Sequence, residues 1–311
     1  MAPMALPVDV DPRTRRRSIP PHAYFVGSAI FHYLGPSFAV LLFARVEPLG
    51  VAWMRIASAA IVFAAWRRPW AQLRGLDRRG WLLIAGLGAV FAVMNACFYE
   101  AIDRLPLAMV AAVEFLGPVA LALLGARIAR NVAAVVAATG GVWLLTHVRL
   151  VGEPVGVAFA FANALLFTAY IVLAHGVSRR RSLGGIDGLA AAMLLGLVFV
   201  FPIGLGQAVH AFTDPVALAA GVGVGLSSSV IPYVFDQLAM ARLPRATYAL
   251  LVALLPATAT VIGILVLHQL PSVVDLAGIC LVMTGVALHR PEAIRSRADS
   301  SQSIEPTGRA G

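Results

Sequence analysis

The chain has 311 residues, of which 60% are hydrophobic and only 13% are charged, and its mean hydropathy is +0.85. Soluble domains carry about 25% charged residues, so this composition excludes that class and indicates a polytopic membrane protein. The net charge is +9, and all 24 basic residues are arginines. They are scattered and belong to no DNA- or RNA-binding motif, so we expect no nucleic-acid partner.

Ten apolar segments follow one another along the chain, each near the roughly 20 residues that a helix needs to cross the hydrocarbon core of a lipid bilayer. We therefore expect an all-α membrane protein with ten transmembrane helices. Residues 1–21 and 291–311 lack periodicity and are expected to be disordered tails. The predicted segments are residues 22–44, 48–66, 80–102, 106–126, 131–147, 154–176, 187–209, 215–240, 245–268 and 271–289.

Two stretches of the chain share a turn sequence and a later proline. Repeated apolar segments with prolines at matching positions are typical of secondary transporters. We therefore predict two related halves, residues 22–147 with helices 1 to 5 and residues 154–290 with helices 6 to 10. At an offset of 138, Arg104-Leu105-Pro106 aligns with Arg242-Leu243-Pro244, and Pro118 aligns with Pro256.

The arginines predict the orientation in the membrane. Only Arg45, Arg104 and Arg149 fall in loops on one side, Arg55 falls inside a segment, and all the others fall on the opposite side. By the positive-inside rule, this distribution predicts that both termini are cytoplasmic. Because each half has five helices, the second half enters the membrane inverted, which gives two inverted five-helix repeats.

Glu114 is the deepest acidic residue of the apolar segments. An ionisable side chain in a membrane span costs at least ~2.5 kcal/mol, so each one suggests a function. Pro118, four residues later, cannot donate a backbone hydrogen bond to the Glu114 carbonyl, which leaves local polarity there. We predict that Glu114 binds substrate or couples protons; a protonated or arginine-paired structural glutamate is the alternative. Pro118, Gly117 and Pro256 are predicted hinge residues.

Asp236 is the second candidate carboxylate. It lies three and seven residues after Tyr233 and Ser229, spacings that place all three on one face of a helix. That face would suit the amino group of a substrate. The alternative is an interfacial carboxylate that is solvated or paired with Arg242.

Further polar residues lie inside apolar segments. His32 titrates in a range that suits proton coupling, and a neutral, packed histidine is the alternative. Asn95 with Tyr99, and Asn163 with Tyr170, form one-sided polar stripes that ligand contact and helix-to-helix hydrogen bonds explain equally well.

Arg55 and Glu100 are expected nearer the membrane surface. Arg55 is expected to reach the outer interface or to pair with Glu47, with a carboxylate-binding role as the alternative. Glu100 comes just before Asp103 and Arg104, and is expected to be a rim residue or a local ion-pair partner.

The chain resembles the EamA-type drug/metabolite transporters, and within them the bacterial threonine and homoserine exporters, over about residues 22–290. The resemblance implies proton-motive-force-driven export of small neutral amino acids through a central cavity, in a multi-pass protein of the bacterial inner membrane. Two positions depart from the common pattern: Leu255 stands before Pro256 where many members have Glu, and His268-Gln269 stands where many have Gly-Glu. The motifs that carry the resemblance are Glu114-Phe115-Leu116-Gly117-Pro118, Pro232-Tyr233, Asp236 and Ala239-Met240-Ala241-Arg242-Leu243-Pro244.

We therefore expect a transporter of a small-molecule substrate with protons as the coupling ion, and no cofactor or metal. No G-x-x-x-x-G-K loop for ATP is present. An integral membrane enzyme is the second class, although H-E-x-x-H and G-x-S-x-G are absent; a channel or scramblase is the third. The substrate could instead be another metabolite or drug, and the sequence leaves a homodimer open.

Overall fold

The computed structural model describes residues 20–125, 129–147, 153–178, 180, 186–240, 242–243 and 245–288. Helices dominate this part of the chain, and it contains no β-strand. The prediction of an all-α protein is therefore confirmed for these residues. The expected tails lie outside them, apart from Pro20 and Pro21.

Within the described residues, seven helical stretches are long and apolar enough to cross a membrane. They coincide with seven of the ten expected segments, and the short helix α3 (Trp70–Arg74) lies between the second and third. These stretches are α1 (Pro21–Leu42), α2 (Pro48–Arg67), α4 (Arg78–Arg104), α7 (Ala129–His147), α9 (Pro154–Ser178), α10 (Ile186–Ala208) with η2 (Val209–Thr213), and α11 (Pro215–Gly225) with η3 (Leu226–Val230) and α12 (Ile231–Met240).

Shorter apolar helices occupy the other three expected segments. In two of these segments the helix is interrupted: α5 ends at Glu114 and α6 begins at Leu116, and α13 ends at Val252 while α14 begins at Leu255. Each interruption comes shortly before a proline. Proline has no backbone N–H, so it cannot donate the regular helical hydrogen bond to the carbonyl four residues earlier. These helices are α5 (Leu107–Glu114), α6 (Leu116–Gly125), α13 (Arg245–Val252), α14 (Leu255–Leu267) and α15 (Val273–Leu288).

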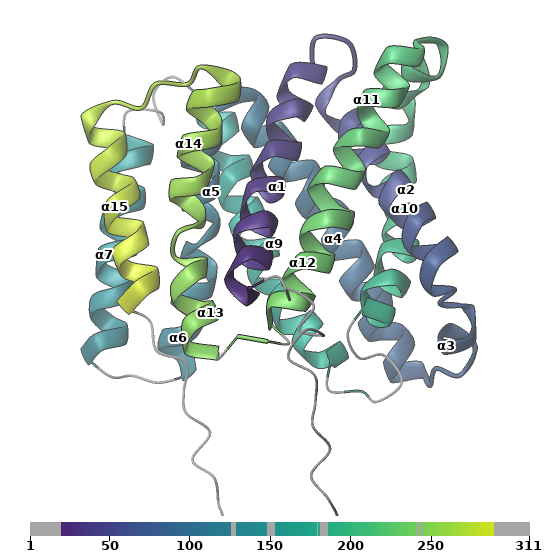
Figure 1. Cartoon of the computed structure of the whole chain (residues 1–311), viewed down its shortest axis with the longest axis horizontal. Coiled ribbons are helices and arrows are strands. Elements are labelled where there is room, and N and C mark those ends of the chain that lie inside the picture. The colour runs from purple at the N-terminus through teal and green to yellow at the C-terminus, as the bar shows by residue number, and fades with distance from the viewer. Residues whose placement is uncertain are drawn as a thin grey trace, which may run out of the picture.

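The helices form one bundle whose ends can be followed in Figure 1. We call the end with α3 and the start of α1 the lower end, and the end with the α1–α2 and α14–α15 loops the upper end. The most extensive helix–helix contacts join α7 with α15, α2 with α10, α4 with α9 and α4 with α10, and α1 packs on α12 and α14. At the α7–α15 contact, a Cβ on Gly141 would come within 2.5 Å of the Gly278 carbonyl oxygen, so only glycine allows this approach.

The largest buried apolar cluster extends through the upper part of the bundle and also reaches Ala134 of α7 and Val286 of α15 near the lower end. It includes Leu42, Tyr99, Ile102, Leu105 and Val110, all of them buried. Smaller apolar clusters lie toward the lower end, and a cavity opens between α1, α4 and α9.

Candidate functional site

A cavity of ≈ 790 Å³ lies among α1, α2, α4, α5, α9 and α12. Its walls include Phe25, Leu87 and Leu189, which lie near the beginnings of α1, α4 and α10, so it extends from the middle of the bundle toward the lower end. Seven of the eight predicted binding or coupling residues line it. They are His32, Asn95, Glu114, Asn163, Tyr170, Tyr233 and Asp236.

Glu114 lies at the inner end of this cavity, as the last residue of α5. Its side chain is buried, with 8% relative exposure for the residue. The helix break at Phe115 follows directly, and the amide of Phe115 bonds back to Ala112 at 3.2 Å. A carboxyl group is therefore held beside irregular backbone within an apolar bundle, an arrangement that proteins tolerate where backbone lines a cavity.

Asn163 approaches the Glu114 carboxyl from α9. It is fully buried (0% exposed), yet neither its amide nitrogen nor its amide oxygen completes a hydrogen bond with the described residues. By contrast, Asn95 of α4 donates to the Phe91 carbonyl at 2.7 Å. Asn163 therefore lies where its amide can interact with the Glu114 carboxyl or, together with that carboxyl, with a polar group in the cavity, because buried polar groups are normally paired.

Arg55 is the residue that sequence reasoning placed least well. It does not reach the outer interface or Glu47; it lines the cavity with 6% exposure. Its Nε donates to the Ser229 hydroxyl at 2.9 Å and its Nη2 donates to the Ser228 carbonyl at 3.1 Å. Its guanidinium also lies 5.7 Å from the centre of the Tyr99 ring. The signal that could have revealed this place was the arginine's position among the small apolar residues of α2.

The serine partners of Arg55 come from the π-helical turn η3. This turn changes the phase of the helix between Ser229 and Asp236, so the spacing of seven does not put them on one regular α-helical face. Ser229 instead binds Arg55, and Asp236 lies beside the hydroxyls of Ser28 and Tyr248 at the lower part of the cavity. Tyr233 and Asp236, the other two residues of the predicted face, both line the cavity.

The remaining predicted residues divide between the cavity and the layer behind it. His32 lines the cavity, and its ring packs edge-on against Tyr33 at 5.2 Å. Tyr99 is fully buried behind the wall, where its ring packs on Phe43 and Phe98 and its hydroxyl has no partner among the described residues. Arg242, the alternative partner of Asp236, lies over the Tyr24 ring at 4.8 Å.

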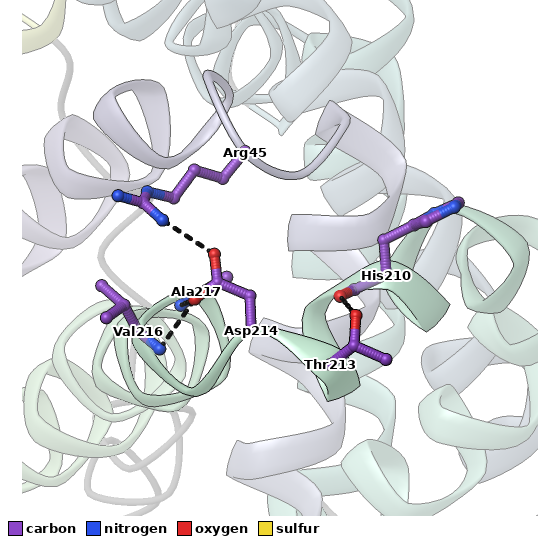
Figure 2. Close-up of polar contacts among 6 residues, drawn as sticks. All are labelled: Arg45, His210, Thr213, Asp214, Val216 and Ala217. Carbon is purple, nitrogen blue, oxygen red and sulfur yellow. Dashed lines mark hydrogen bonds and ion pairs between the residues drawn. The ribbon is translucent and has the colours of Figure 1, made fainter.

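An ion pair joins two loops at the upper end of the bundle (Figure 2). Arg45, between α1 and α2, donates to Asp214 at 2.8 Å, and Asp214 also accepts from the backbone amides of Val216 and Ala217 at the start of α11. The hydrogen bond from Arg45 is the main reason that the pKa of Asp214 is lowered, and the Ala217 amide acts in the same direction. Nearby, the Thr213 hydroxyl donates to the His210 carbonyl at 2.9 Å.

A similar ion pair lies at the lower end. Arg180 donates to Asp77, which also accepts from the Gly80 amide at the start of α4. The hydrogen bond from Arg180 is the largest cause of the lowered pKa of Asp77, followed by the Gly80 amide. Glu100 forms an ion pair with Arg104 at 2.6 Å, as its place near the first turn predicted.

Together, apolar spanning helices and a cavity inside the bundle that carries several polar and ionisable side chains define a polytopic membrane protein with an internal cavity. The sequence profile of the EamA-like transporter family matches residues 154–289. The threonine/homoserine exporter RhtA of Salmonella typhimurium (strain LT2) is 30% identical over 256 residues, which cover 80% of this chain and 84% of that protein. The chain belongs to the EamA-like transporter family.

Other relatives agree with this assignment. The threonine/homoserine exporter RhtA of Escherichia coli (strain K12) is 32% identical over 244 residues, covering 76% of this chain and 79% of that protein. A probable terminal-alkyne amino-acid exporter of Streptantibioticus cattleyicolor is 30% identical over 224 residues, covering 70% and 66%. A solved crystal structure with 19% identity has a TM-score of 0.55 and covers 86% of this chain and 96% of that one, which concerns the fold alone.

Proposed function

We propose that this protein is a secondary transporter that exports small neutral amino acids, such as threonine or homoserine, across a bacterial inner membrane. The observation that carries the proposal is the set of opposite charges at the inner end of the cavity, where Arg55 and Glu114 face one space in an apolar bundle. A zwitterion is the class of molecule that such a site suits. Relatives that bear the names of amino-acid exporters support the same substrate class.

The transport mechanism that we propose is alternating access between two inverted five-helix repeats. Ten crossings result when α5–α6, α11–η3–α12 and α13–α14 each count as one. In this arrangement each crossing of the first half is equivalent to the crossing five places later in the second half. The contact of α4 with α9 then corresponds to the contact of α12 with α1, and the contact of α4 with α10 corresponds to the contact of α11 with α2. The contacting pairs α2–α10, α5–α14 and α7–α15 each join two equivalent crossings, one from each half, as expected for related halves.

The helix breaks support the same proposal. α5 ends at Glu114 and α13 ends at Val252, positions that correspond at the offset of 138 that relates the two RLP turns. The first of these turns lies at the upper end, since the Leu107 amide bonds to Gln269 of the α14–α15 loop. The second turn lies between α12 and α13 at the lower end (Figure 1).

The lower end is the cytoplasmic side in this proposal. It carries Arg67, Arg74, Arg78, Arg79 and Arg130, whereas Arg45 and Arg104 lie at the upper end. The cavity extends toward the lower end, so an exporter in this state would take up cytoplasmic substrate. Reporter fusions after Gln269 should behave as external and those after Arg180 as internal; an external Arg180 fusion would contradict the ten-helix arrangement.

Counterflow in proteoliposomes tests the proposed function. Vesicles loaded with unlabelled threonine should accumulate labelled threonine transiently and with saturation, and empty liposomes should not. Conversion of the label into another compound would indicate an enzyme, and non-saturable equilibration without exchange would indicate a channel or scramblase. A host that expresses the chain should also tolerate higher concentrations of the transported amino acid.

A further inference from the structure

We infer that Arg55 is the residue that binds the substrate's carboxylate, so the transporter selects molecules with a free carboxylate near an ammonium group. The inference rests on the proposed function and deepens it by naming the group that Arg55 recognises. Its basis is the position of Arg55 in the cavity, the hydrogen bonds that hold its guanidinium, and the lack of a carboxylate partner.

The hydrogen bonds of Arg55 to the protein come from one edge of its guanidinium, and the Tyr99 ring lies against the group. Nε donates a hydrogen bond to the Ser229 hydroxyl, and Nη2 donates one to the Ser228 carbonyl. A guanidinium has five N–H donors, and among the described residues no other hydrogen bond from Arg55 occurs. Nη1 therefore keeps its donors for a molecule in the cavity that Arg55 lines, and the planar guanidinium can bind a carboxylate through two parallel hydrogen bonds.

Arg55 also lacks a counterion at close range. Ion pairs within 4.0 Å join other residues of the described chain, and Arg55 is in none of them. Its direct partners are a hydroxyl and a carbonyl, which carry no net charge. A buried charge without a paired opposite charge is costly, and a bound carboxylate would supply that pairing.

The opposite side of the cavity supplies the complement for an ammonium group. Glu114 lies near enough for its charge to interact with that of Arg55, without forming an ion pair with it. The buried amide of Asn163 lies beside the Glu114 carboxyl and adds a further polar group there. An α-amino acid placed between the two charges would satisfy both, whereas a simple amine or a simple carboxylic acid would satisfy one.

The competing explanation is that Arg55 serves only as a structural cation that balances Glu114 and Asp236 across the cavity. The two explanations differ in what the wild-type protein does with ligand analogues. A structural cation makes no demand on the ligand's carboxylate. A carboxylate-binding arginine discriminates against ligands that lack this group, because its donors then stay unpaired.

Inhibition of threonine counterflow by unlabelled analogues tests the inference in the wild-type protein. Threonine should inhibit well, and threoninamide, which keeps the ammonium group and the side chain but lacks the carboxylate, should inhibit at least about tenfold more weakly. 3-Hydroxybutyrate, which lacks the ammonium group, should also be weak. Equal inhibition by threonine and threoninamide would overturn the inference while leaving amino-acid transport in place.

Variants at Arg55 give the second half of the test. In Arg55→Gln the inhibition by threonine should weaken at least about tenfold while that by threoninamide changes little, so the preference for the acid should largely disappear. Arg55→Lys should keep part of the preference for threonine over threoninamide, because the lysine ammonium keeps the positive charge but lacks the two parallel donors of a guanidinium. Arg74→Gln, which removes an exposed arginine of α3, is the matched control and should keep the full preference.

Each outcome bears on a different claim. If folded Arg55→Gln still prefers threonine to threoninamide, another residue must bind the carboxylate, and the inference is overturned. If Arg55→Gln fails to reach the membrane, the wild-type analogue series and Arg55→Lys still decide. If no amino acid exchanges at all, the proposed function fails and the inference fails with it.

Discussion

Asp77 and Asp214 occupy matching places at opposite ends of the bundle. Asp77 caps the start of α4 and binds Arg180, and Asp214 caps the start of α11 and binds Arg45. In the proposed arrangement of two five-helix halves, each aspartate follows the second crossing of its half, and each arginine follows the first crossing of a half. The two ion pairs are therefore exchanged by the same operation that exchanges the helix contacts, which makes them candidates for opposite gates.

Breaking the two ion pairs should bias the transporter in opposite directions. Asp214→Asn should ease separation of the α1–α2 loop from α11 and favour opening at the upper end, and Asp77→Asn should favour opening at the lower end. With Cys97 and Cys280 replaced by Ala and a reporter cysteine at the cavity residue Phe98, labelling by an external impermeant thiol reagent should quicken in Asp214→Asn and slow in Asp77→Asn. Changes in the same direction in both would contradict the gate assignment.

The Arg45–Asp214 pair should also make stability depend on pH. Its hydrogen bond lowers the pKa of Asp214 in the folded protein, so its stabilising effect is fully present above the ordinary aspartate pKa and is lost as pH falls through the lowered one. Asp214→Asn keeps a capping acceptor but removes the charge. In detergent, wild type should unfold at a higher temperature than Asp214→Asn at pH 7, and the difference should vanish in acid. Arg45→Gln should likewise unfold at a lower temperature than wild type at pH 7 and at the same temperature in acid. A difference in unfolding temperature that does not depend on pH would show that helix capping, not the ion pair, is responsible.

The sequence predicted the seven long spanning helices because hydropathy is a local property of the chain. It predicted hinges at Pro118 and Pro256, and each proline follows a break in its helix. Glu114 was found from its depth in an apolar segment. The sequence could not predict that Arg45 meets Asp214, since 169 residues separate them and only tertiary packing brings them together. It also misplaced Arg55, because its serine partners belong to a π-helical turn that regular 3.6-residue spacing does not reveal.

Pro118 and Pro256 should matter for the rate of transport more than for folding. Each follows a break in its helix, where bending can occur without loss of backbone hydrogen bonds. Replacing either with Ala restores an N–H donor and should let the helix continue, so transport should fall severalfold while membrane abundance changes little. Pro202→Ala is the control, because Pro202 lies inside the uninterrupted helix α10 and is exposed. Parallel loss of abundance and transport would indicate a folding role instead.

Glu114→Gln should separate proton coupling from substrate binding. Glutamine keeps the size and hydrogen-bonding capacity of the side chain, so the protein should reach the membrane normally. If Glu114 couples protons, the variant should lose export driven by a pH gradient and keep exchange; if it binds the ammonium group, both should fall. Glu100→Gln, at the Arg104 ion pair of the rim, is the control. Wild-type accumulation with wild-type pH dependence would move the site to Asp236 or His32.

His268 should be a point of backbone strain at the end of α14. It adopts the left-handed conformation, with φ 54°, and stands where many members of the family have glycine. This conformation costs a residue with a side chain about 1–2 kcal/mol, and glycine escapes most of that cost. His268→Gly should therefore raise the free energy of unfolding by about 1 kcal/mol, after the greater freedom of glycine in the unfolded chain is deducted. His268→Ala is the matched control: it removes the imidazole but keeps a Cβ and so keeps the strain. Equilibrium unfolding in mixed detergent micelles can measure both, and equal stabilisation by Gly and Ala would show that the imidazole, rather than the backbone, is the source of the effect.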